Sequence, residues 1–301
     1  MKKVIITGVS GFIGSATACY LLEQGIEVVG LSRTKPEISD KNFIHLPMEL
    51  SKVDEICTDA LGGADVFYHF AWEGSAGIER SDTKLQLSNV QWTIDCLKLA
   101  KALDCPRFVV AGSIMERETL AAALNQGGRP GLAYVYGGGK LAAHIMCKSI
   151  AADLGIGLVW TLITNAYGVG EYSPRFVNST IRKILREEEL QFTSGTQNYD
   201  FVYISDVAKA FYLIGKNGRA FNEYVIGSGH PRPLKEFILE MKESLAPDRE
   251  FVFGNVPFTG TNLPISAFDC SNTTKDTGFV AEISFSKGVK KTMEWIEEKD
   301  R

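Results

Sequence analysis

Short apolar runs alternate with longer helical patterns through the first half of the chain. The first run, Lys3–Thr7 (KVIIT), and the second, Ile26–Leu31 (IEVVGL), flank a helix-like segment at Phe12–Gln24. Two longer helical stretches follow, at Lys84–Leu103 and Ala133–Leu154. Further apolar runs lie before, between and after them, at Phe43–Leu46, Ala64–Phe70, Arg107–Gly112 and Gly157–Ile163. Strands that alternate with helices indicate a parallel sheet covered on both faces, so we expect an α/β, doubly wound fold.

The regular alternation of expected strands and helices ends after about Asn165. The patterns beyond it predict one strand, Phe201–Ile204, and four helices, at Phe176–Glu189, Ser205–Lys216, Leu234–Leu245 and Val289–Glu298. No stretch rich in serine and glycine marks a linker. We therefore predict a larger domain over residues 1–164, joined by parts of about 200–230, and a smaller, interleaved domain over residues 165–301.

Three glycines follow the first expected strand at a fixed spacing. Gly8, Gly11 and Gly14 come directly after VIIT and open the expected helix. Glycine permits a tight turn and a close approach of the backbone to a pyrophosphate, whose negative charge the helix dipole favours. In this strand–turn–helix context the spacing is typical of a dinucleotide site, and a structural turn with incidental glycines is the simpler alternative. We therefore expect the larger domain to bind a dinucleotide.

The end of the second expected strand bears on which dinucleotide binds. NAD enzymes commonly place an acidic residue there to bond the ribose 2′-hydroxyl. This chain has Ser32, Arg33 and Lys35 instead. Because a guanidinium suits a 2′-phosphate, we expect NADP, with NAD as the alternative; an exposed basic loop is the simplest structural explanation of these charges.

A tyrosine and a lysine in the helix Ala133–Leu154 are candidates for proton transfer. Tyr136 and Lys140 are four residues apart and share one helix face. A nearby ammonium favours the phenolate and lowers the tyrosine pKa, so Tyr136 can exchange a proton with a substrate oxygen as hydride moves. Ser113 follows an expected strand at the sheet edge where ligands bind, and its hydroxyl can bond the same oxygen.

Three consecutive glycines, Gly137–Gly139, lie between that tyrosine and that lysine. Each interior glycine costs a helix about 1 kcal/mol relative to alanine. We expect the glycines to leave room for a bulky substrate or for close packing.

Composition narrows the classes of function. The chain has 301 residues and a net charge of -4, which gives no support for a nucleic-acid partner. No apolar run approaches a membrane span, and glycines interrupt the N-terminal run that superficially resembles a signal peptide. The four histidines have no metal-like spacing, so we expect no metal site, and we expect His69 to be a packed, hydrogen-bonded core residue. Scattered cysteines without a C-x-x-C pair indicate buried thiols in a reducing compartment, and hence the cytoplasm; they are Cys19, Cys57, Cys96, Cys105, Cys147 and Cys270.

The chain resembles the extended short-chain dehydrogenase/reductase family, in its nucleotide-sugar epimerase/dehydratase group. The resemblance covers nearly the whole chain and rests on these stretches: TGVSGFIG, ADVFYHFAW, LSNVQWTIDCLKLA, FVVAGS, YGGGK, TNAYGVG, DFVYISDVAKAF and KGVKKTMEWI. It implies Ser113, Tyr136 and Lys140 as the catalytic set, with Lys140 also bonding the nicotinamide ribose. It also implies a homodimer through the helices Lys84–Leu103 and Ala133–Leu154.

Further site residues are expected around that set. The residues expected at the cofactor, besides Tyr136 and Lys140, are Gly8, Gly11, Phe12, Ile13, Gly14, Ser32, Arg33, Glu49, Leu50, Phe70, Ala71 and Asn89. The residues expected at the substrate are Trp72, Ser113, Ile114, Asn165 and Arg175. Trp72 follows a strand at the ligand edge of the sheet, where packing is an equally good account of it.

Departures from the family pattern bear on the reaction. Family dehydratases carry an acidic pair soon after the serine. Here Ile114, Met115 and Glu116 follow Ser113 without such a pair, which argues against 4,6-dehydration. The arginines that commonly grip the substrate diphosphate are replaced by Tyr199 and by the uncharged stretch Pro264–Phe268, so Arg175 or Lys275 is expected to substitute. We expect reduction by NADPH of a keto group on a nucleotide-activated (6-deoxy) sugar, with Tyr136 as proton donor. The alternatives are an NAD-dependent nucleotide-sugar epimerase and, in another class, a non-catalytic NADP-binding sensor or scaffold.

Overall fold

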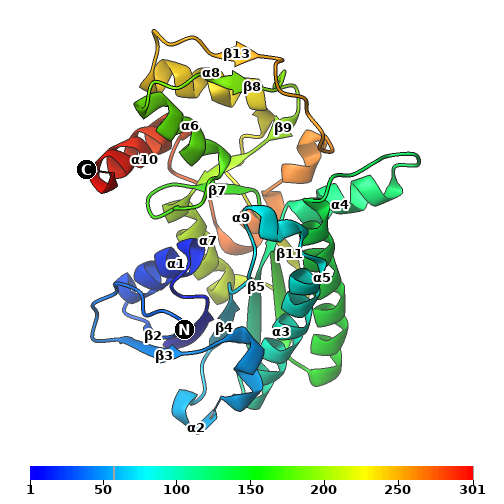
Figure 1. Cartoon of the computed structure of the whole chain (residues 1–301). Coiled ribbons are helices and arrows are strands. Elements are labelled where there is room, and N and C mark those ends of the chain that lie inside the picture. Colours follow the sequence, from blue (N-terminus) through cyan, green and yellow to red (C-terminus); the bar gives the residue numbers. More distant parts are fainter. Residues whose placement is uncertain (57, 301) are drawn as a thin grey trace.

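A seven-stranded parallel sheet forms the centre of the protein. The computed structural model describes residues 1–56 and 58–300, and its sheet has the strand order β11-β6-β5-β4-β1-β2-β3 (Figure 1). Every neighbouring pair of these strands is parallel. The strands are β1 (Lys3–Thr7), β2 (Glu27–Ser32), β3 (Phe43–Pro47), β4 (Val66–His69), β5 (Arg107–Ser113), β6 (Gly157–Ile163) and β11 (Glu223–Ile226). The expected α/β, doubly wound fold is confirmed.

Helices cover both faces of this sheet. One face carries α1 (Phe12–Glu23) and α7 (Ile204–Asn217), and the other carries α3 (Thr83–Ala102) and α5 (Tyr134–Leu154) (Figure 1). The burial of β1 explains this arrangement: Val4 and Ile6 lie in the core with α1 and α7, whereas Ile5 lies in the core with α3 and α5. Because successive side chains of a strand point to opposite faces, a continuous apolar run serves two cores.

A smaller group of elements lies beyond the carboxyl edge of the sheet (Figure 1). Its helices are α6 (Phe176–Leu185), α8 (Leu234–Leu245) and α10 (Phe285–Lys299). Its short strand pairs are β7 (Asn165–Tyr167) with β10 (Phe201–Tyr203), β8 (Gln191–Phe192) with β13 (Val252–Phe253), and β9 (Asn198–Tyr199) with β12 (Arg232–Pro233). Phe201, Phe237 and Phe285 pack on one another at its centre, with ring centroids 5.0–5.3 Å apart.

The second half of the chain supplies both groups of elements. The strand β11 is part of the central sheet, and the helix α7 packs on one face of it, although both follow β7 in sequence. The division at residues 164/165 stays a prediction. The remaining short elements are η1 (Leu50–Glu55), α2 (Thr58–Leu61), η2 (Ile78–Ser81), η3 (Ile265–Phe268) and α9 (Ser271–Thr277).

Among the described helices of ten or more residues, α4 (Met115–Leu124) was not expected from the sequence; the short helices α2 and α9 were not expected either. The helix α4 begins directly after β5 and, with the loop that follows it, projects from the body of the protein (Figure 1). Its outer residues Leu120 and Leu124 are exposed, so its apolar pattern does not mark a single buried face. The helix α6 is shorter than expected because the chain turns after Leu185, where Glu187 adopts a positive φ of 56°.

Cysteines differ in part from the expectation of buried thiols. Cys96, Cys105 and Cys147 are buried, Cys270 is half-buried, and Cys19 is exposed because it lies on the solvent side of α1. Cys57 lies outside the described residues.

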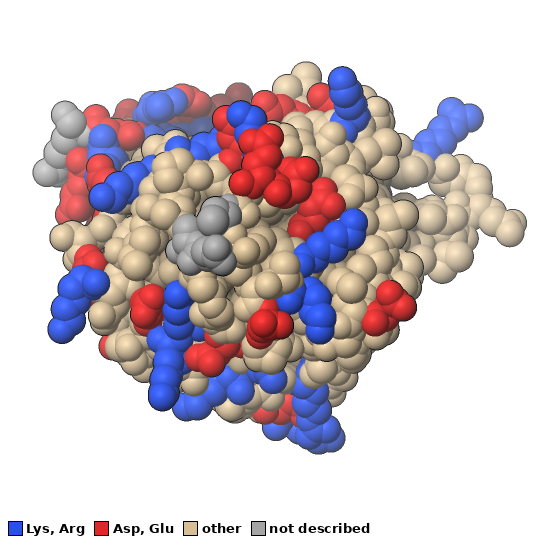
Figure 2. Space-filling model, turned by 90° about the horizontal axis from the view of Figure 1, so that it is seen from below, with Lys and Arg blue, Asp and Glu red and all other residues tan. Residues whose placement is uncertain are grey.

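Charges of both signs are mixed on the surface. Figure 2 shows lysine and arginine side chains interspersed with aspartate and glutamate on one face of the molecule. Within the two described stretches, no helix is long and apolar enough to cross a membrane.

Candidate active site

The glycine turn after β1 is built by close backbone approaches. Gly8 has a φ of +72°, and a Cβ there would lie 2.7 Å from the backbone nitrogen of Ala71. A Cβ at Gly14 would lie 2.1 Å from the carbonyl oxygen of Gly8. The helix α1 then begins at Phe12 without a side-chain cap, so its first amide groups remain available to an anion. This cradle fits the pyrophosphate of a dinucleotide.

A cavity of about 170 Å³ lies beside this turn and is called the glycine-loop cavity. Its wall brings together residues at and after the ends of β1, β2, β3 and β4, most of them expected at a cofactor. They are Gly8, Ser10, Gly11, Leu31, Ser32, Arg33, Met48, Leu50, Phe70, Ala71, Trp72 and Glu73. Glu49 lines an adjoining cavity of about 500 Å³ with Arg33. Phe12, Ile13 and Gly14 form the start of α1 and line neither cavity.

A carboxylate shares the glycine-loop cavity with the expected basic residue. The Arg33 guanidinium lies 3.1 Å from a carboxylate oxygen of Glu73, which follows β4. Ser32 is buried at the end of β2, and its hydroxyl donates to the carbonyl of Thr34 at 2.8 Å. The cavity therefore contains both the cation Arg33, which the sequence indicated at the cofactor, and the anion Glu73, which it did not indicate there.

Asn89 holds the loop after β4 in place. It is buried, its side-chain oxygen accepts from the backbone N–H of Glu73, and its amide donates to the carbonyls of Glu73 and Leu85. It lines neither of these two cavities, so the structure places it behind the expected cofactor position.

Trp72 lies on the wall of the glycine-loop cavity, not on the sugar side as expected. Its indole N–H donates to the side-chain oxygen of Gln86 at 2.8 Å. The Lys140 ammonium lies 3.8 Å from the centre of its ring.

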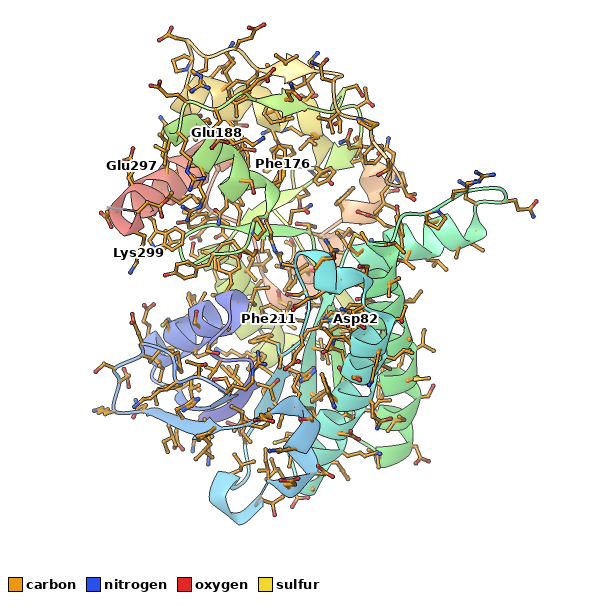
Figure 3. The ribbon with its side chains drawn as sticks, in the orientation of Figure 1. Asp82, Phe176, Glu188, Phe211, Glu297 and Lys299 are labelled. Carbon is orange, nitrogen blue, oxygen red and sulfur yellow. The ribbon has the colours of Figure 1, made fainter. Side chains whose placement is uncertain are left out.

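A second cavity, of about 330 Å³, lies between the sheet and the smaller group of elements and is called the Tyr136 cavity. It contains all of Ser113, Ile114, Tyr136, Asn165 and Arg175 from the expected set. From the smaller group, α6 contributes the labelled residue Phe176 in Figure 3. Arg80, Glu118, Glu171 and Tyr199 also line this cavity.

Burial controls the proton affinities of Tyr136 and Lys140. Burial raises the pKa of Tyr136, and it lowers the pKa of Lys140 to about 7. Arg175, Arg80 and the Ser113 hydroxyl lower the pKa of Tyr136 without reversing this upward shift. The expectation that Lys140 lowers the Tyr136 pKa below its usual value is therefore wrong for this structure, because desolvation dominates. Lys140 donates instead to the carbonyl of Ala111 at 2.8 Å.

Comparison with known proteins identifies the family. The NAD dependent epimerase/dehydratase family matches residues 4–227, which is most of the chain. This chain belongs to that family. It is 23% identical over 304 residues to CDP-abequose synthase of Salmonella muenchen, with 97% of each protein covered. It is also 23% identical to a trifunctional protein of Arabidopsis thaliana, covering 98% of this chain and 47% of that one. That relative is named UDP-glucose 4,6-dehydratase/UDP-4-keto-6-deoxy-D-glucose 3,5-epimerase/UDP-4-keto-L-rhamnose-reductase.

Among solved structures, the fold resembles UDP-glucose 4-epimerase from Thermotoga maritima with UDP-glucose. The TM-score is 0.82 at 19% sequence identity, and the match covers 99% of this chain and 100% of the other. The expected resemblance to the epimerase/dehydratase group is confirmed, and its NAD(P)-binding fold with it.

The structure places the residues expected to substitute for the family's arginines in different cavities. Tyr199 lines the Tyr136 cavity, and Arg175 lines it while lying 3.4 Å from the carboxylate of Glu171. Lys275 belongs to a different cavity, with Arg117 and Glu223, and does not reach this one. A cation that the sequence did not single out, Arg80 of η2, lies on the cavity wall instead.

Two glutamates of α4 were given no site role from the sequence, because the helix itself was not expected. Glu118 lines the Tyr136 cavity, and burial raises its pKa to about 7. Glu116 is buried behind the cavity, where its carboxylate accepts from the Ser113 N–H at 2.9 Å and from the Trp160 indole at 3.1 Å, and lies 3.0 Å from His144 Nδ1. Their spacing from Ser113, three and five residues, is the sequence signal that could have found them.

His69 has the expected packed, hydrogen-bonded environment. Its ring nitrogens lie 2.9 Å from the Thr7 hydroxyl and 3.1 Å from the Thr93 hydroxyl. Burial lowers its pKa to about 3, so the imidazole is neutral.

The three glycines of α5 have different surroundings. A Cβ at Gly137 would lie 2.0 Å from the Thr119 hydroxyl and 2.8 Å from the Met115 carbonyl, whereas a Cβ at Gly138 would meet nothing within 4 Å. Close packing of α5 on α4 therefore accounts for Gly137, and nothing in the structure requires Gly138.

Two alanine substitutions are expected to separate these positions. Gly138→Ala should raise the free energy of unfolding by about 0.5–1 kcal/mol, because it removes backbone freedom from the unfolded chain. Gly137→Ala should lower it by about 1–3 kcal/mol through overpacking against α4. Urea unfolding followed by circular dichroism measures both, and equal shifts in the two variants would contradict the assignment.

Proposed function

We propose that this protein is an oxidoreductase that acts on a nucleotide-activated sugar and uses NADPH to reduce a keto group. The observation that supports it best is that side chains from the walls of the two cavities contact each other. Tyr136 lines one cavity, and Lys140 stacks on Trp72, which lines the other. When bound, the nicotinamide cofactor supplies hydride exchange at carbon.

In this proposal, residues of the chain position the substrate oxygen and move its proton. Ser113 and Tyr136 line the same cavity, so both hydroxyls can meet one substrate oxygen at the end of β5. The raised pKa of Tyr136 keeps its phenol protonated at neutral pH, as a proton donor to a carbonyl oxygen must be. Lys140 is anchored to β5 through Ala111, which holds its ammonium beside the wall of the glycine-loop cavity.

The choice of cofactor distinguishes this proposal from epimerisation. No carboxylate comes from the end of β2, and the exposed Arg33 guanidinium supports binding of a 2′-phosphate. The ion pair with Glu73 favours the second candidate, an NAD-dependent epimerase, because it both neutralises Arg33 and supplies a carboxylate for a ribose hydroxyl.

A carboxyl group in the Tyr136 cavity weakens the argument against dehydration. The expectation rested on the missing acidic pair after Ser113, but Glu118 does bring a carboxyl group into the Tyr136 cavity. It is one carboxyl where family dehydratases carry two, so reduction remains the function that we propose.

Cofactor titration tests the proposal. We expect NADPH to bind about tenfold more tightly than NADH, because a charge-assisted hydrogen bond to the 2′-phosphate contributes about 1.5–3 kcal/mol. Arg33→Ala should remove that preference, and Glu73→Gln should increase it by freeing the guanidinium. Quenching of tryptophan fluorescence measures the affinities, and a panel of keto-sugar nucleotides followed by NADPH absorbance measures turnover.

The opposite results are equally informative. A clear preference for NADH, with NAD retained by the purified protein in native mass spectrometry, would support the epimerase. No NADPH consumption with any keto sugar would contradict the reductase.

The homodimer and the cytoplasmic location remain part of the proposal. Leu87 of α3 and Ile145 and Met146 of α5 are exposed apolar residues on the two helices through which we expect the dimer to form. Exposed apolar side chains on adjacent helices favour such an interface.

A further inference from the structure

Arg80 lines the Tyr136 cavity, although the sequence did not single it out. It belongs to η2, in the loop after β4, and its guanidinium carbon lies 4.6 Å from the centre of the Tyr136 ring. Ser113 and Glu118 line the same cavity. The positive charge of Arg80 acts on Tyr136, Glu118 and Tyr199, and it lowers the pKa of each against the effect of burial.

This arginine lacks a partner within the described residues. Its Nε is buried and has no hydrogen-bond acceptor, and none of the ion pairs found in residues 1–56 and 58–300 includes it. The other cation of the cavity, Arg175, already lies 3.4 Å from the Glu171 carboxylate. A buried donor without an acceptor costs free energy, and an anionic ligand would recover that cost.

We propose that Arg80 binds a carboxylate on the sugar ring of the substrate, which makes a nucleotide-linked uronic acid the substrate class. This inference rests on the proposed function. The planar guanidinium presents paired N–H donors that match the two oxygens of a carboxylate. Its guanidinium carbon lies 4.6 Å from the centre of the Tyr136 ring, which places that fork beside the catalytic side chain.

The position of Arg80 separates a ring carboxylate from the substrate diphosphate. The Tyr136 hydroxyl must contact the oxygen of the reacting carbon, so a group held beside the same aromatic ring lies within about one sugar ring of that carbon. The diphosphate lies beyond the anomeric carbon, farther from the reaction. Arg80 is therefore placed for a substituent next to the reacting carbon.

Glu118 makes this binding depend on pH. Its pKa is raised to about 7 by burial, and the groups that face it are Arg80, with Tyr199 and Tyr136 on the same cavity wall and Tyr134 beside them. Below pH 7 the carboxyl is neutral, which leaves the charge of Arg80 to the ligand. Above pH 7 the carboxylate competes for Arg80 and repels the ligand, so affinity should fall as pH rises through 7.

Calorimetry with UDP-glucuronic acid and UDP-glucose tests the proposal. The Tyr136→Phe protein, saturated with its preferred cofactor, serves as the background because it prevents turnover. UDP-glucuronic acid is expected to bind about tenfold more tightly than UDP-glucose at pH 6.5, and Arg80→Met is expected to remove this difference by weakening the uronic acid alone. Arg80→Lys should retain part of it, and Glu118→Gln should remove its pH dependence.

Arg129 supplies a matched control. Arg129→Met changes an exposed arginine in the loop after α4 and should alter neither affinity. Equal affinity for the two sugars, or equal loss of both in Arg80→Met, would overturn the carboxylate site and leave the proposed function standing. Binding of neither UDP sugar would overturn the carboxylate site and would also count against the proposed function.

Discussion

Replacing Tyr136 by phenylalanine is expected to lower turnover by about 10²–10⁴-fold, the usual contribution of a positioned general acid or base. The tyrosine is buried on the cavity wall, which Ser113 also lines. The ring packs edge-on against Trp72, with ring centroids 6.1 Å apart, and this contact survives the substitution. Cofactor affinity should therefore be unchanged, while the proton has no donor.

Tyr134 offers a matched control two residues away on the same helix. Its hydroxyl donates to the Thr261 hydroxyl at 2.8 Å and does not line the Tyr136 cavity. Tyr134→Phe should retain most of the activity. Turnover measured by NADPH absorbance, beside cofactor affinity from fluorescence, distinguishes the variants. Unchanged turnover in Tyr136→Phe would overturn the proton-donor role and favour a non-catalytic sensor.

Replacing Glu116 by alanine is expected to destabilise the protein by about 3–5 kcal/mol. Its buried carboxylate accepts from the Ser113 N–H and the Trp160 indole and lies 3.0 Å from His144. The substitution leaves these buried donors without an acceptor and opens a cavity beside the stacked His144 and Trp160 rings. Because Ser113 ends β5 in this network, activity should fall together with stability.

Glu116→Gln keeps the shape and an acceptor oxygen while it removes the charge, so its loss of stability should be smaller. Glu243→Ala, at an exposed position of α8, should change the free energy of unfolding by less than about 0.5 kcal/mol. Urea unfolding at pH 7 measures all three variants. A loss in Glu116→Ala no larger than that in Glu243→Ala would show that the network contributes little.

The main strands and helices could be predicted because each carries its own pattern. Lys3–Thr7, Gly157–Ile163 and Leu234–Leu245 have the predicted bounds, since an unbroken apolar run buries both faces of a strand and a spaced one buries a single helix face. The helix α4 could not be predicted in this way. It projects from the body with exposed leucines, so no apolar stripe distinguishes it from a loop.

Some features of the candidate site could likewise be predicted from neighbouring residues, and others could not. Glycine spacing and the Tyr136–Lys140 interval are local features, because backbone sterics and helix geometry act within a few residues. The upward shift of the Tyr136 pKa could not be predicted from neighbouring residues. It follows from burial, which depends on elements distant in sequence.

The sequence by itself determined the parallel sheet, the glycine cradle and the helix that bears Tyr136 and Lys140, because short-range periodicity and spacing specify them. Only the tertiary structure decided which charges meet. It brought Glu73 to Arg33, Glu116 to His144, and Arg80 onto the ring of Tyr136. These partners lie on different loops and helices, and their distances are set by how those elements pack across the sheet edge.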